Sequence, residues 1–558
     1  MWNIKYIKII LIGLLIALTF SSCFKRKGKS SSLGGGGGGG ASDSSGGGGV
    51  VAEGGGGGLV AGGGASDPCT ITISPTSVVV SVNRTRTFSN TSSGSCGAIT
   101  YSVSVGTGTV AADGVYTAPA ATGTATVRAS DGTVNSDASV TIIQAAKIVT
   151  GEAHSCARFN DNRIRCWGDN TYGQLGIASS DTSPHHTPSS ESFVSLGTGL
   201  DAKDIFAGAY HTCAVLNDTD VSDGDDTDKV KCWGRNNNGQ LGIGSLVDQN
   251  NPSAVAILDF GTDDRVNELA LGAFHTCARI WDNTIRCWGS DTYGQLGNGS
   301  AGDFTSPQTS ASGSLGSTGR VDLGSSADTA NRIAAGGYHT CAIRADTYIR
   351  CWGRDNNGQV GNGGSMSSAV QDDVSVPLPS GADTASAIAL GGYHSCAIRD
   401  TDSRLFCWGR DSEGQVGNNA TLANQASAVT VASLGSGRTV TSIALGGHHT
   451  CARLDDNSVK CWGRNTNGQL GMDSVTDQAI PPVASIDLGS GRSASSIAAS
   501  SGDPDAGASN GSQVTCAVLD NNTVKCWGFN NQGQLGQGDT ASRGDAAGEM
   551  AALSSINL

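Results

Sequence analysis

Paired cysteines beside histidines are the residues in this sequence whose types and spacing could do chemistry. Seven Cys-Trp-Gly tripeptides each follow an upstream cysteine, and six of the upstream cysteines follow His-Ser or His-Thr. Thiolate and imidazole groups are zinc ligands, whereas two facing cysteines in an oxidising compartment form a disulfide. The pairs are Cys156 with Cys166, Cys213 with Cys232, Cys277 with Cys287, Cys341 with Cys351, Cys396 with Cys407, Cys451 with Cys461 and Cys516 with Cys526.

The separation within each pair favours disulfides over metal sites. The two cysteines are 10 residues apart in five of the seven pairs, 11 in the fifth pair and 19 in the second. With a turn at the midpoint, a separation of ten places them opposite each other on a hairpin, where facing Cα atoms lie about 4.5 Å apart. Seven zinc centres in one chain would be unusual, and Val514 replaces the histidine of the seventh unit. We therefore predict seven disulfides, an eighth between Cys69 and Cys96, and no metal.

The histidines that precede the upstream cysteines recur once per repeat at the same position. A side chain needed for packing shows this recurrence, whereas a catalytic residue is normally present once. We interpret them as structural and predict neither a catalytic residue nor a cofactor. These histidines are His154, His211, His275, His339, His394 and His449.

A stretch rich in aspartate lies between the cysteines of the second pair. Oxygen-rich loops of this kind can hold Ca²⁺, but Gly224 is not placed as the EF-hand pattern requires. We interpret the stretch as a solvated acidic loop, with a calcium site as the weaker alternative. The acidic residues are Asp218, Asp220, Asp223, Asp225, Asp226 and Asp228.

The composition of the chain predicts strands and turns as the elements that position these residues. Of 558 residues 82 are glycine, and charged residues are 15%. The abundant Gly, Ser, Thr, Asn, Asp and Val favour short strands joined by turns over helices. The formal net charge of −14 argues against a nucleic-acid partner, since binding to a phosphate backbone needs a basic surface. We therefore expect an all-β protein.

The cysteine pairs belong to a unit that is repeated seven times. Each Cys-Trp-Gly is followed by Gly-Gln-Leu-Gly or Gly-Gln-Val-Gly, and successive first cysteines are 57, 64, 64, 55, 55 and 65 residues apart. One unit reads as strands at 269–271, 275–280 and 285–288, with a turn at Asp282 and Asn283. Strand repeats of this period are typical of propeller blades.

These units resemble the regulator-of-chromosome-condensation repeats, seven of which close a ring in that family. The resemblance covers Ala146 to Leu558 and implies a seven-bladed β-propeller over residues 146–558. Family members include a eukaryotic nuclear nucleotide-exchange factor. A secreted bacterial β-lactamase inhibitor has a related fold. The fold therefore does not fix the function.

The N-terminal residues predict a targeting signal followed by a flexible tether. Lys5 and Lys8 precede an apolar run that is too short to span a membrane, so residues 1–22 are interpreted as an export signal. Ser21-Ser22-Cys23 resembles the lipobox of bacterial lipoproteins, which implies acylation of Cys23. Phe24 and not Asp follows this cysteine, which in such lipoproteins favours an anchor in the outer membrane, and we expect the chain to face the cell surface. The alternative is a soluble secreted protein. Residues 23–66, which are mostly Gly, Ser and Ala, are predicted to be a disordered tether.

A small β-domain is predicted between the tether and the repeats, over residues 67–145. Gly114-Val115-Tyr116-Thr117-Ala118-Pro119 resembles a motif of bacterial immunoglobulin-like domains, which implies a β-sandwich that acts as a spacer or adhesive module. Val, Ile and Thr are frequent in its predicted strands. These are 70–74, 78–82, 86–90, 99–105, 123–130 and 136–143.

The function expected from these features is that of a membrane-anchored, surface-displayed scaffold that binds a protein or a surface glycan, most simply as a monomer. One alternative is an inhibitor of a secreted or periplasmic enzyme. A second is a hydrolytic enzyme, but the chain has no metal-binding signature beyond the cysteine units. A third is guanine-nucleotide exchange, but an export signal and disulfides place the protein in the wrong compartment.

Two expectations concern the geometry of the ring. The segments that follow Gly-Gln-Leu-Gly differ in length and should emerge on one face, with His185, His186, Phe304 and Met366 as weak candidate binding residues. A Val-x-Leu or Ile-x-Leu strand precedes later repeats but not the first. We predict that residues 556–558 supply it by pairing with residues 147–149.

Overall fold

The computed structural model describes residues 67–178, 181–218, 228–258, 260, 265–298, 320–323, 329–364, 370–379, 384–418, 422–503, 505 and 513–558. The predicted export signal, Cys23 and the predicted tether lie outside these residues. The chain forms one compact unit over Ser66–Leu558. Within the described ranges the helices are the short η1 (Pro188–Ser190) and α1 (Glu549–Ala552). A search of these ranges finds no helix with the length and apolarity needed to cross a membrane.

Residues from Asp67 to Ile143 form a small β-domain of three sheets. The sheet orders are β1-β4, β2-β9-β8-β5 and β3-β7-β6, and β2 runs parallel to β9. The strands are β1 (Thr70–Ser74), β2 (Ser77–Ser81), β3 (Thr85–Thr87), β4 (Ser89–Ser93), β5 (Thr100–Gly106), β6 (Thr109–Val110), β7 (Val115–Thr117), β8 (Gly123–Ser130) and β9 (Asn135–Ile143).

Alternation along the strands builds the core of this domain. In β8 every second residue is buried, and Val127 is fully enclosed. Phe88 and Tyr116 fill the core between the sheets, because side chains of successive strand residues point to opposite faces. The Tyr116 hydroxyl donates a 2.6 Å hydrogen bond to the carbonyl of Thr107, which satisfies the polar end of that ring.

The repeats form seven antiparallel sheets that follow one another along the chain. Five of them contain three strands and two contain four in the described residues. The first three sheets are β10 (Ala145–Thr150), β11 (His154–Phe159) and β12 (Ile164–Gly168); β13 (Leu200–Ala207), β14 (His211–Asp218) and β15 (Lys229–Gly234); and β16 (Val266–Leu271), β17 (His275–Ile280) and β18 (Ile285–Gly289). The fourth and fifth are β19 (Ala330–Ala335), β20 (His339–Arg344), β21 (Ile349–Gly353) and β22 (Val370–Ser375); and β23 (Ala385–Leu390), β24 (His394–Arg399), β25 (Leu405–Gly409) and β26 (Gln425–Thr430). The last two are β27 (Val440–Leu445), β28 (His449–Leu454) and β29 (Val459–Gly463); and β30 (Ala494–Ala499), β31 (Val514–Leu519) and β32 (Val524–Gly528).

The hairpin of β17 and β18 shows how the repeat sequence determines a sheet. Its register places Cys277 opposite Cys287 and Thr276 opposite Trp288. The turn contains Asn283 with a φ of 64°, a left-handed conformation that asparagine adopts more readily than most residues. Trp288 is fully buried between neighbouring sheets. The hairpin that was predicted from the cysteine spacing is therefore present in the structure.

The outer edge of each sheet is formed by the segment that follows Gly-Gln-Leu-Gly. This segment is a regular strand as β22 and β26, and in four other repeats it makes isolated bridges such as Gly168 with His185; in the third repeat most of it lies outside the described residues. Val194, in one of the Val-x-Leu segments, donates its backbone N–H to the carbonyl of Ile164 at 2.9 Å. These segments therefore complete the repeat that precedes them.

The predicted pairing of the C-terminus with the first repeat is wrong. The backbone N–H of Ile556 donates to the carbonyl of Val524 at 2.7 Å, on β32 of the last sheet. The reason is the one just given, since every such segment pairs with the third strand of its own repeat. The side chains of Ile556 and Leu558 nevertheless pack in one buried cluster with Ile148 and Trp167 of the first sheet.

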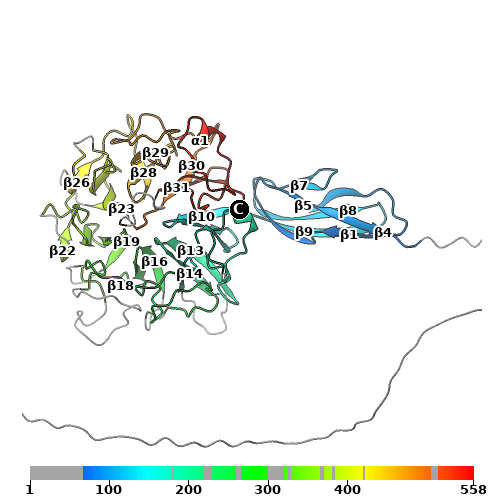
Figure 1. The fold of residues 1–558 in the computed structure, drawn as a ribbon, viewed down its shortest axis with the longest axis horizontal. Helices are drawn as coiled ribbons and strands as arrows, with labels where there is room; N and C mark the ends of the chain where they lie inside the picture. Colours follow the sequence, from blue (N-terminus) through cyan, green and yellow to red (C-terminus); the bar gives the residue numbers. More distant parts are fainter. Residues whose placement is uncertain are drawn as a thin grey trace, which may run out of the picture. The chain divides into compact units, whose positions relative to one another are not determined.

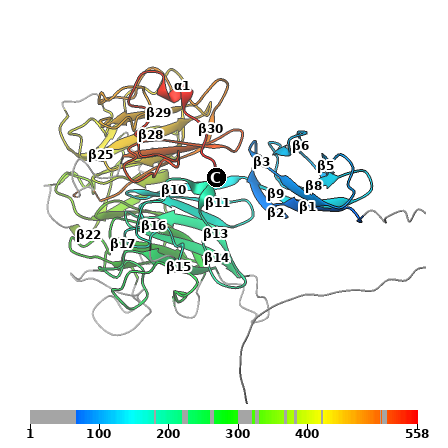
Figure 2. The same ribbon diagram turned by 45° about the vertical axis from the view of Figure 1, so that its right-hand side comes forward.

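The seven sheets are arranged around a common centre. In chain order, each first strand contacts the next, through β10, β13, β16, β19, β23, β27 and β30, and β30 contacts β10. Figure 1 shows the sheets following the colour sequence around a circle, from cyan through green and yellow to red, and Figure 2 shows the same ring turned. The arrangement is that of a β-propeller.

Candidate functional site

The repeated histidines connect neighbouring sheets. Each Nε2 lies 2.8–2.9 Å from a hydroxyl of the next repeat, and that hydroxyl donates to a glutamine carbonyl, so Nε2 carries the proton. The pairs are His154 with Thr212, His211 with Thr276, His275 with Thr340, His339 with Ser395, His394 with Thr450 and His449 with Thr515.

These imidazoles are buried and serve packing. Burial lowers the pKa of His154 to about 4 and the pKa of His275 to about 3, so both are neutral at pH 7. Each ring lies against a glycine. A Cβ on Gly151, for example, would come within 2.2 Å of Cε1 of His154. The structural interpretation of these histidines accounts for both observations.

The tryptophans of Cys-Trp-Gly also join neighbouring repeats. Each indole Nε1 donates to the carbonyl of the glutamine in the preceding repeat's Gly-Gln-Leu-Gly or Gly-Gln-Val-Gly, over 2.9–3.1 Å. The bonds run from Trp167 to Gln534, Trp233 to Gln174, Trp288 to Gln240, Trp352 to Gln295, Trp408 to Gln359, Trp462 to Gln415 and Trp527 to Gln469. The tryptophan and glutamine that recur in every repeat thus join neighbouring sheets of the ring.

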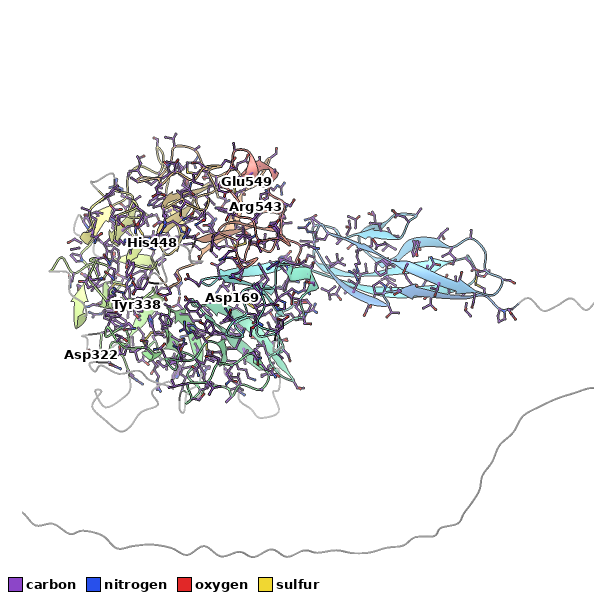
Figure 3. The ribbon with its side chains drawn as sticks, in the orientation of Figure 1. Asp169, Asp322, Tyr338, His448, Arg543 and Glu549 are labelled. Atoms are coloured by element: carbon purple, nitrogen blue, oxygen red, sulfur yellow. A yellow bond between two sulfur atoms is a disulfide. The ribbon has the colours of Figure 1, made fainter. Side chains whose placement is uncertain are left out.

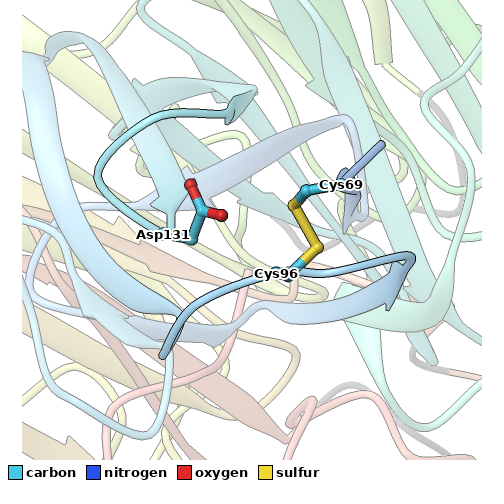
Figure 4. Close-up of side chains that lie close together, drawn as sticks. All are labelled: Cys69, Cys96 and Asp131. Atoms are coloured by element: carbon cyan, nitrogen blue, oxygen red, sulfur yellow. A yellow bond between two sulfur atoms is a disulfide. The ribbon is translucent and has the colours of Figure 1, made fainter. Parts of the chain in front are cut away.

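The cysteines of the repeats are joined across the hairpins. The two Cα atoms of each pair are 4.1 Å apart, in the pairs that the spacing predicts, and the residues are buried. In the small domain Cys69 is bonded to Cys96. Asp131 lies beside this disulfide (Figure 4). Its carboxylate accepts the backbone N–H groups of Val134 and Thr133, which lower its pKa. These three residues are therefore engaged in a disulfide and a turn, and do not form a metal site.

The other candidates from the sequence are placed only in part. Of the acidic residues proposed as a calcium site, Asp220, Asp223, Asp225 and Asp226 lie outside the described residues. Asp228 accepts a 2.6 Å hydrogen bond from Lys203, so its carboxylate has a cationic partner. Among the loop residues, Phe304 and Met366 lie outside the described ranges. His185 Nδ1 is 2.9 Å from Glu191 in a half-buried pair.

The centre of the ring contains a channel of about 270 Å³, whose lining includes Lys147, Thr150 and Ser501 beside apolar side chains. All seven first strands line it, through small residues such as Ala270, Ala389 and Ala498. Alanine at these positions leaves room for the channel and supplies no polar group that could do chemistry. The chemically distinctive side chains lie instead where the first strands end.

Aromatic side chains surround this end of the channel. From the second repeat to the sixth, the residue before the repeated histidine is Tyr210, Phe274, Tyr338, Tyr393 and His448, whereas the first repeat has Ala153. The rings of the first three follow one another with centroids 5.8 Å apart. Tyr338 and His448 lie nearer the middle of the ring of sheets than Asp322 or Glu549 (Figure 3). Four adjacent sheets thus present aromatic edges on one face.

Arg354 and Asp505 form the best-defined polar contact on this face. The guanidinium of Arg354 lies about 5 Å from the ring centroids of Tyr293, Tyr338 and Tyr393, at 4.8, 5.3 and 5.1 Å. Its Nη1 donates to Asp505 at 2.6 Å, and the Tyr393 hydroxyl donates to the same carboxylate. Burial and the charges of the nearby aspartates raise the pKa of Tyr338, whose hydroxyl therefore stays protonated at pH 7.

Asp505 reaches this position because the seventh repeat carries a longer connection. Residues 500–513 join β30 to β31, a connection of 14 residues, whereas residues 151–153 join β10 to β11 with three. Along it the Asp503 N–H donates to Glu152 of the first repeat at 2.6 Å, and Asp503 accepts from Tyr338 of the fourth. The connection thus crosses from the seventh sheet to side chains of the first and fourth repeats.

Sequence reasoning missed this face. We considered the segments after Gly-Gln-Leu-Gly, but two other features of the sequence indicate this face. One is the ring-bearing residue that varies just before five of the six repeated histidines. The other is the longer connection before Val514, the residue that stands in the seventh repeat where the other six have histidine. Both signals are visible when the repeats are aligned at their first cysteines.

Comparison with known protein families identifies the repeated unit. Two family models, both described as the regulator of chromosome condensation (RCC1) repeat, match the chain. One matches residues 145–174, 331–359, 385–415, 440–469 and 508–534, and the other matches residues 161–215, 229–279 and 402–453. The chain carries RCC1 repeats. The strands, the glutamine carbonyls and the tryptophans described above are therefore features of these RCC1 repeats.

Curated relatives share the repeats over long stretches. The ultraviolet-B receptor UVR8 of Arabidopsis thaliana is 29% identical over 371 residues, which cover 66% of this chain and 76% of the receptor. The mitochondrial RCC1 domain-containing protein RUG3 of the same plant is 26% identical, over 56% of this chain and 68% of RUG3. The human ligase HERC5 is 32% identical over 222 residues, which cover 39% of this chain and 20% of the ligase.

Solved structures show the same fold for the RCC1 repeats. Human WBSCR16 aligns with a TM-score of 0.51 and 19% identity, over 64% of this chain and 85% of that one. Yeast Prp20, solved with Kap60, aligns with a TM-score of 0.52 and 18% identity, over 64% and 78%. At these identities the likeness concerns the fold, which is an RCC1-type β-propeller.

Proposed function

We propose that this protein is a protein-binding scaffold whose binding face is the aromatic and arginine-bearing end of the channel. The observation that carries the proposal is the Arg354–Asp505 contact, where a stacked arginine and a tyrosine hydroxyl together hold one carboxylate. Tyrosine and arginine are enriched where proteins bind one another. The repeated His, Trp and Cys residues are occupied in packing, so the variable residues of this face remain available for recognition.

The finer architecture of the proposal has two parts. We take the seven sheets as the seven blades of one closed propeller, supported by the tryptophan bonds that run from each repeat to its predecessor, including Trp167 to Gln534. We take residues 67–145 as an immunoglobulin-like spacer, supported by the stacked sheets around Phe88 and Tyr116. Together they would hold the binding face away from a surface.

The surface in this proposal is the bacterial outer membrane. Support comes from the sequence, in which a short apolar run ends in Ser21-Ser22-Cys23. Acylation of Cys23 would anchor the chain, and residues 24–66 would give it reach. The full chain should partition into detergent, and the Cys23→Ser variant should stay in the aqueous phase. A wild-type protein found wholly in the aqueous phase would refute the anchor and leave the scaffold proposal standing.

The scaffold function is tested by capture of a partner with the full Cys23→Ser chain. The bait is presented to envelope proteins and to culture-supernatant proteins. We expect one protein to be retained in fixed stoichiometry and to be released by moderate salt, because rim charges contribute to such interfaces. Retention of no protein in fixed stoichiometry, together with turnover of a hydrolase substrate, would contradict the scaffold and favour an enzyme.

A further inference from the structure

The Arg354 cluster, defined as Arg354 with Tyr293, Tyr338 and Tyr393, has a counterpart two repeats earlier. The Arg235 cluster consists of Arg235 with Tyr172, Tyr210 and Phe274. The guanidinium of Arg235 lies 4.7, 5.0 and 5.2 Å from these three ring centroids, which is nearly the geometry around Arg354.

The two clusters occupy equivalent positions of the RCC1 repeats. Each arginine follows Cys-Trp-Gly in its own repeat. In each cluster one tyrosine precedes Gly-Gln-Leu-Gly of the preceding repeat, and the remaining two rings precede consecutive histidines. The edge-to-face pair Tyr172–Tyr210 has centroids 5.7 Å apart, and its counterpart Tyr293–Tyr338 has centroids 5.3 Å apart. The propeller therefore builds the same arginine platform twice.

The platforms differ in what they hold. Arg354 pairs with Asp505 of its own chain. Within the described part of the chain, the Arg235 guanidinium has no ion pair or hydrogen bond, although it is half-buried among three rings. The undescribed positions of the 500–513 connection carry no acidic residue, since they are Pro504 and the segment Ala-Gly-Ala-Ser-Asn-Gly-Ser.

The neighbouring carboxylates of the face are engaged elsewhere. Glu152 and Asp503 both lie close enough to Tyr210 that their charges, with burial, raise its pKa. Glu152 accepts the Asp503 backbone N–H, and the Asp503 carboxylate accepts the hydroxyl of Tyr338. Their negative charges nevertheless repel an acidic ligand. Such a ligand must therefore place its carboxylate in direct contact with the Arg235 guanidinium.

We propose that the Arg235 cluster is a binding site for the carboxylate side chain of an acidic peptide segment in a protein partner. This inference rests on the proposed scaffold function and specifies its partner class. The chain's own Asp505 shows which chemistry the platform accepts, because an aspartate in a peptide loop occupies the equivalent position. A guanidinium held between rings is already ordered, and it offers paired donors that match a carboxylate. Phe274 stands where Tyr393 donates its hydroxyl, so the Arg235 site relies mainly on the guanidinium.

Binding of a fluorescently labelled hexaglutamate to the full Cys23→Ser chain tests the site, with hexaglutamine as the uncharged control. We expect saturable binding of hexaglutamate that weakens with salt, and none of hexaglutamine. Arg235→Gln should weaken hexaglutamate binding at least tenfold, and Arg235→Lys should weaken it severalfold because the planar fork is lost. Absence of saturable binding, or equal binding by Arg235→Gln, would overturn the site.

Two further variants make the test specific. Arg464 follows Cys-Trp-Gly in the sixth repeat, where its Nε donates to Thr466 and no aromatic platform surrounds it in the described residues. Arg464→Gln should therefore leave hexaglutamate binding unchanged, and a tenfold loss there would show general charge attraction instead of a site. Asp505→Asn should free the Arg354 cluster and raise the stoichiometry from one hexaglutamate to two. An unchanged stoichiometry would refute the equivalence of the platforms.

One comparison distinguishes a peptide carboxylate from a glycan carboxylate. A second distinguishes failure of this site from failure of the scaffold function. Hexagalacturonate presents carboxylates on a glycan, and its tighter binding than hexaglutamate would overturn the peptide assignment. A partner captured equally by wild type and Arg235→Gln would leave the scaffold function standing and remove this site from it. Arginine-dependent hexaglutamate binding without any captured protein would support the site and count against the scaffold function.

Discussion

The indole Nε1 of Trp167 donates a 3.0 Å hydrogen bond to the carbonyl oxygen of Gln534, which lies 367 residues later in the chain. The Ser155 hydroxyl donates to the same oxygen at 2.9 Å. Every other repeat makes the equivalent tryptophan bond to the repeat just before it, so this contact joins the first repeat to the last with the same chemistry. The junction of the chain's ends is therefore built like the other junctions of the ring.

Replacement of Trp167 measures the strength of this junction. Trp167→Phe removes the indole donor and part of the buried ring, and we expect the free energy of unfolding to fall by about 1–3 kcal/mol. Trp288→Phe is the matched control, because Trp288 makes the same 3.0 Å bond to Gln240 within the ring. Urea unfolding should give similar losses for both. A loss for Trp288→Phe alone would mean that the first and last repeats are not joined.

The C-terminal residues should stabilise the ring through side-chain burial. Ile556 is 3% exposed and Leu558 is 8% exposed, and burial of such side chains stabilises by about 1.5–3 kcal/mol each. Deletion of residues 554–558 should lower the melting temperature by several degrees. Ile556→Ala should account for a large part of this, whereas Asn557→Ala, at an exposed position, should change little. Equal melting temperatures of the truncated and complete chains would contradict the buried packing.

The buried histidines predict that stability falls as the pH falls below neutrality. An unfolded imidazole takes up a proton near pH 6.5, whereas burial lowers the pKa of His211 to about 3 and the pKa of His449 to about 3. The unfolded chain thus binds more protons, and each histidine costs up to about 1.4 kcal/mol per pH unit below 6.5, until the folded pKa is reached. Burial raises the pKa of Asp355 and of Asp411 to about 6, so these two groups gain their protons first in the folded state and offset part of the effect.

Urea unfolding at pH 7, 6 and 5 checks this dependence. His275→Val introduces the residue type that the seventh repeat has at this position, Val514. It should reduce the dependence of the unfolding free energy on pH by the contribution of one histidine. A stability that is unchanged between pH 7 and 5 would show that the histidines are protonated in the folded protein.

The state of the cysteines is testable by mass. Sixteen cysteines lie in eight bonded pairs. We expect no thiol labelling of these residues in the unreduced protein, whether native or denatured, and sixteen additional labels after reduction. The two masses should differ by two hydrogens per bridge before labelling. Extensive labelling of the denatured, unreduced chain would show free thiols.

The sequence predicted those parts of the fold that depend on local periodicity. The hairpin around Cys277 and Cys287 follows from their spacing, and β17 has the bounds that the pattern predicts. In the small domain β1 and β8 also match, but the predicted strand at 86–90 is divided between β3 and β4. The break comes at Phe88, whose burial places it in the core between two sheets.

The sequence did not predict features that depend on contacts between distant repeats. The outer strand was assigned to the wrong repeat for a different reason: the Val-x-Leu and Ile-x-Leu segments were interpreted as preceding the next repeat, whereas Ile556 pairs with Val524 of its own repeat. The arginine platforms combine residues of three consecutive repeats. Asp505 reaches Arg354 across 151 residues of sequence. No short window contains such a set, so it emerged only when the sheets were placed in space.

The separation of 367 residues between Trp167 and Gln534 also affects the order in which the protein folds during synthesis. When a chain is synthesised from its N-terminus, the first sheet is made before the residues that cover Trp167, Phe159 and Ile148. Their partners among the final residues, Ile556 and Leu558, arrive after every other repeat has been made. Until then this apolar flank is accessible to chaperones and proteases. Arrival of Ile556 and Leu558 therefore decides when this flank of the newly made protein becomes covered.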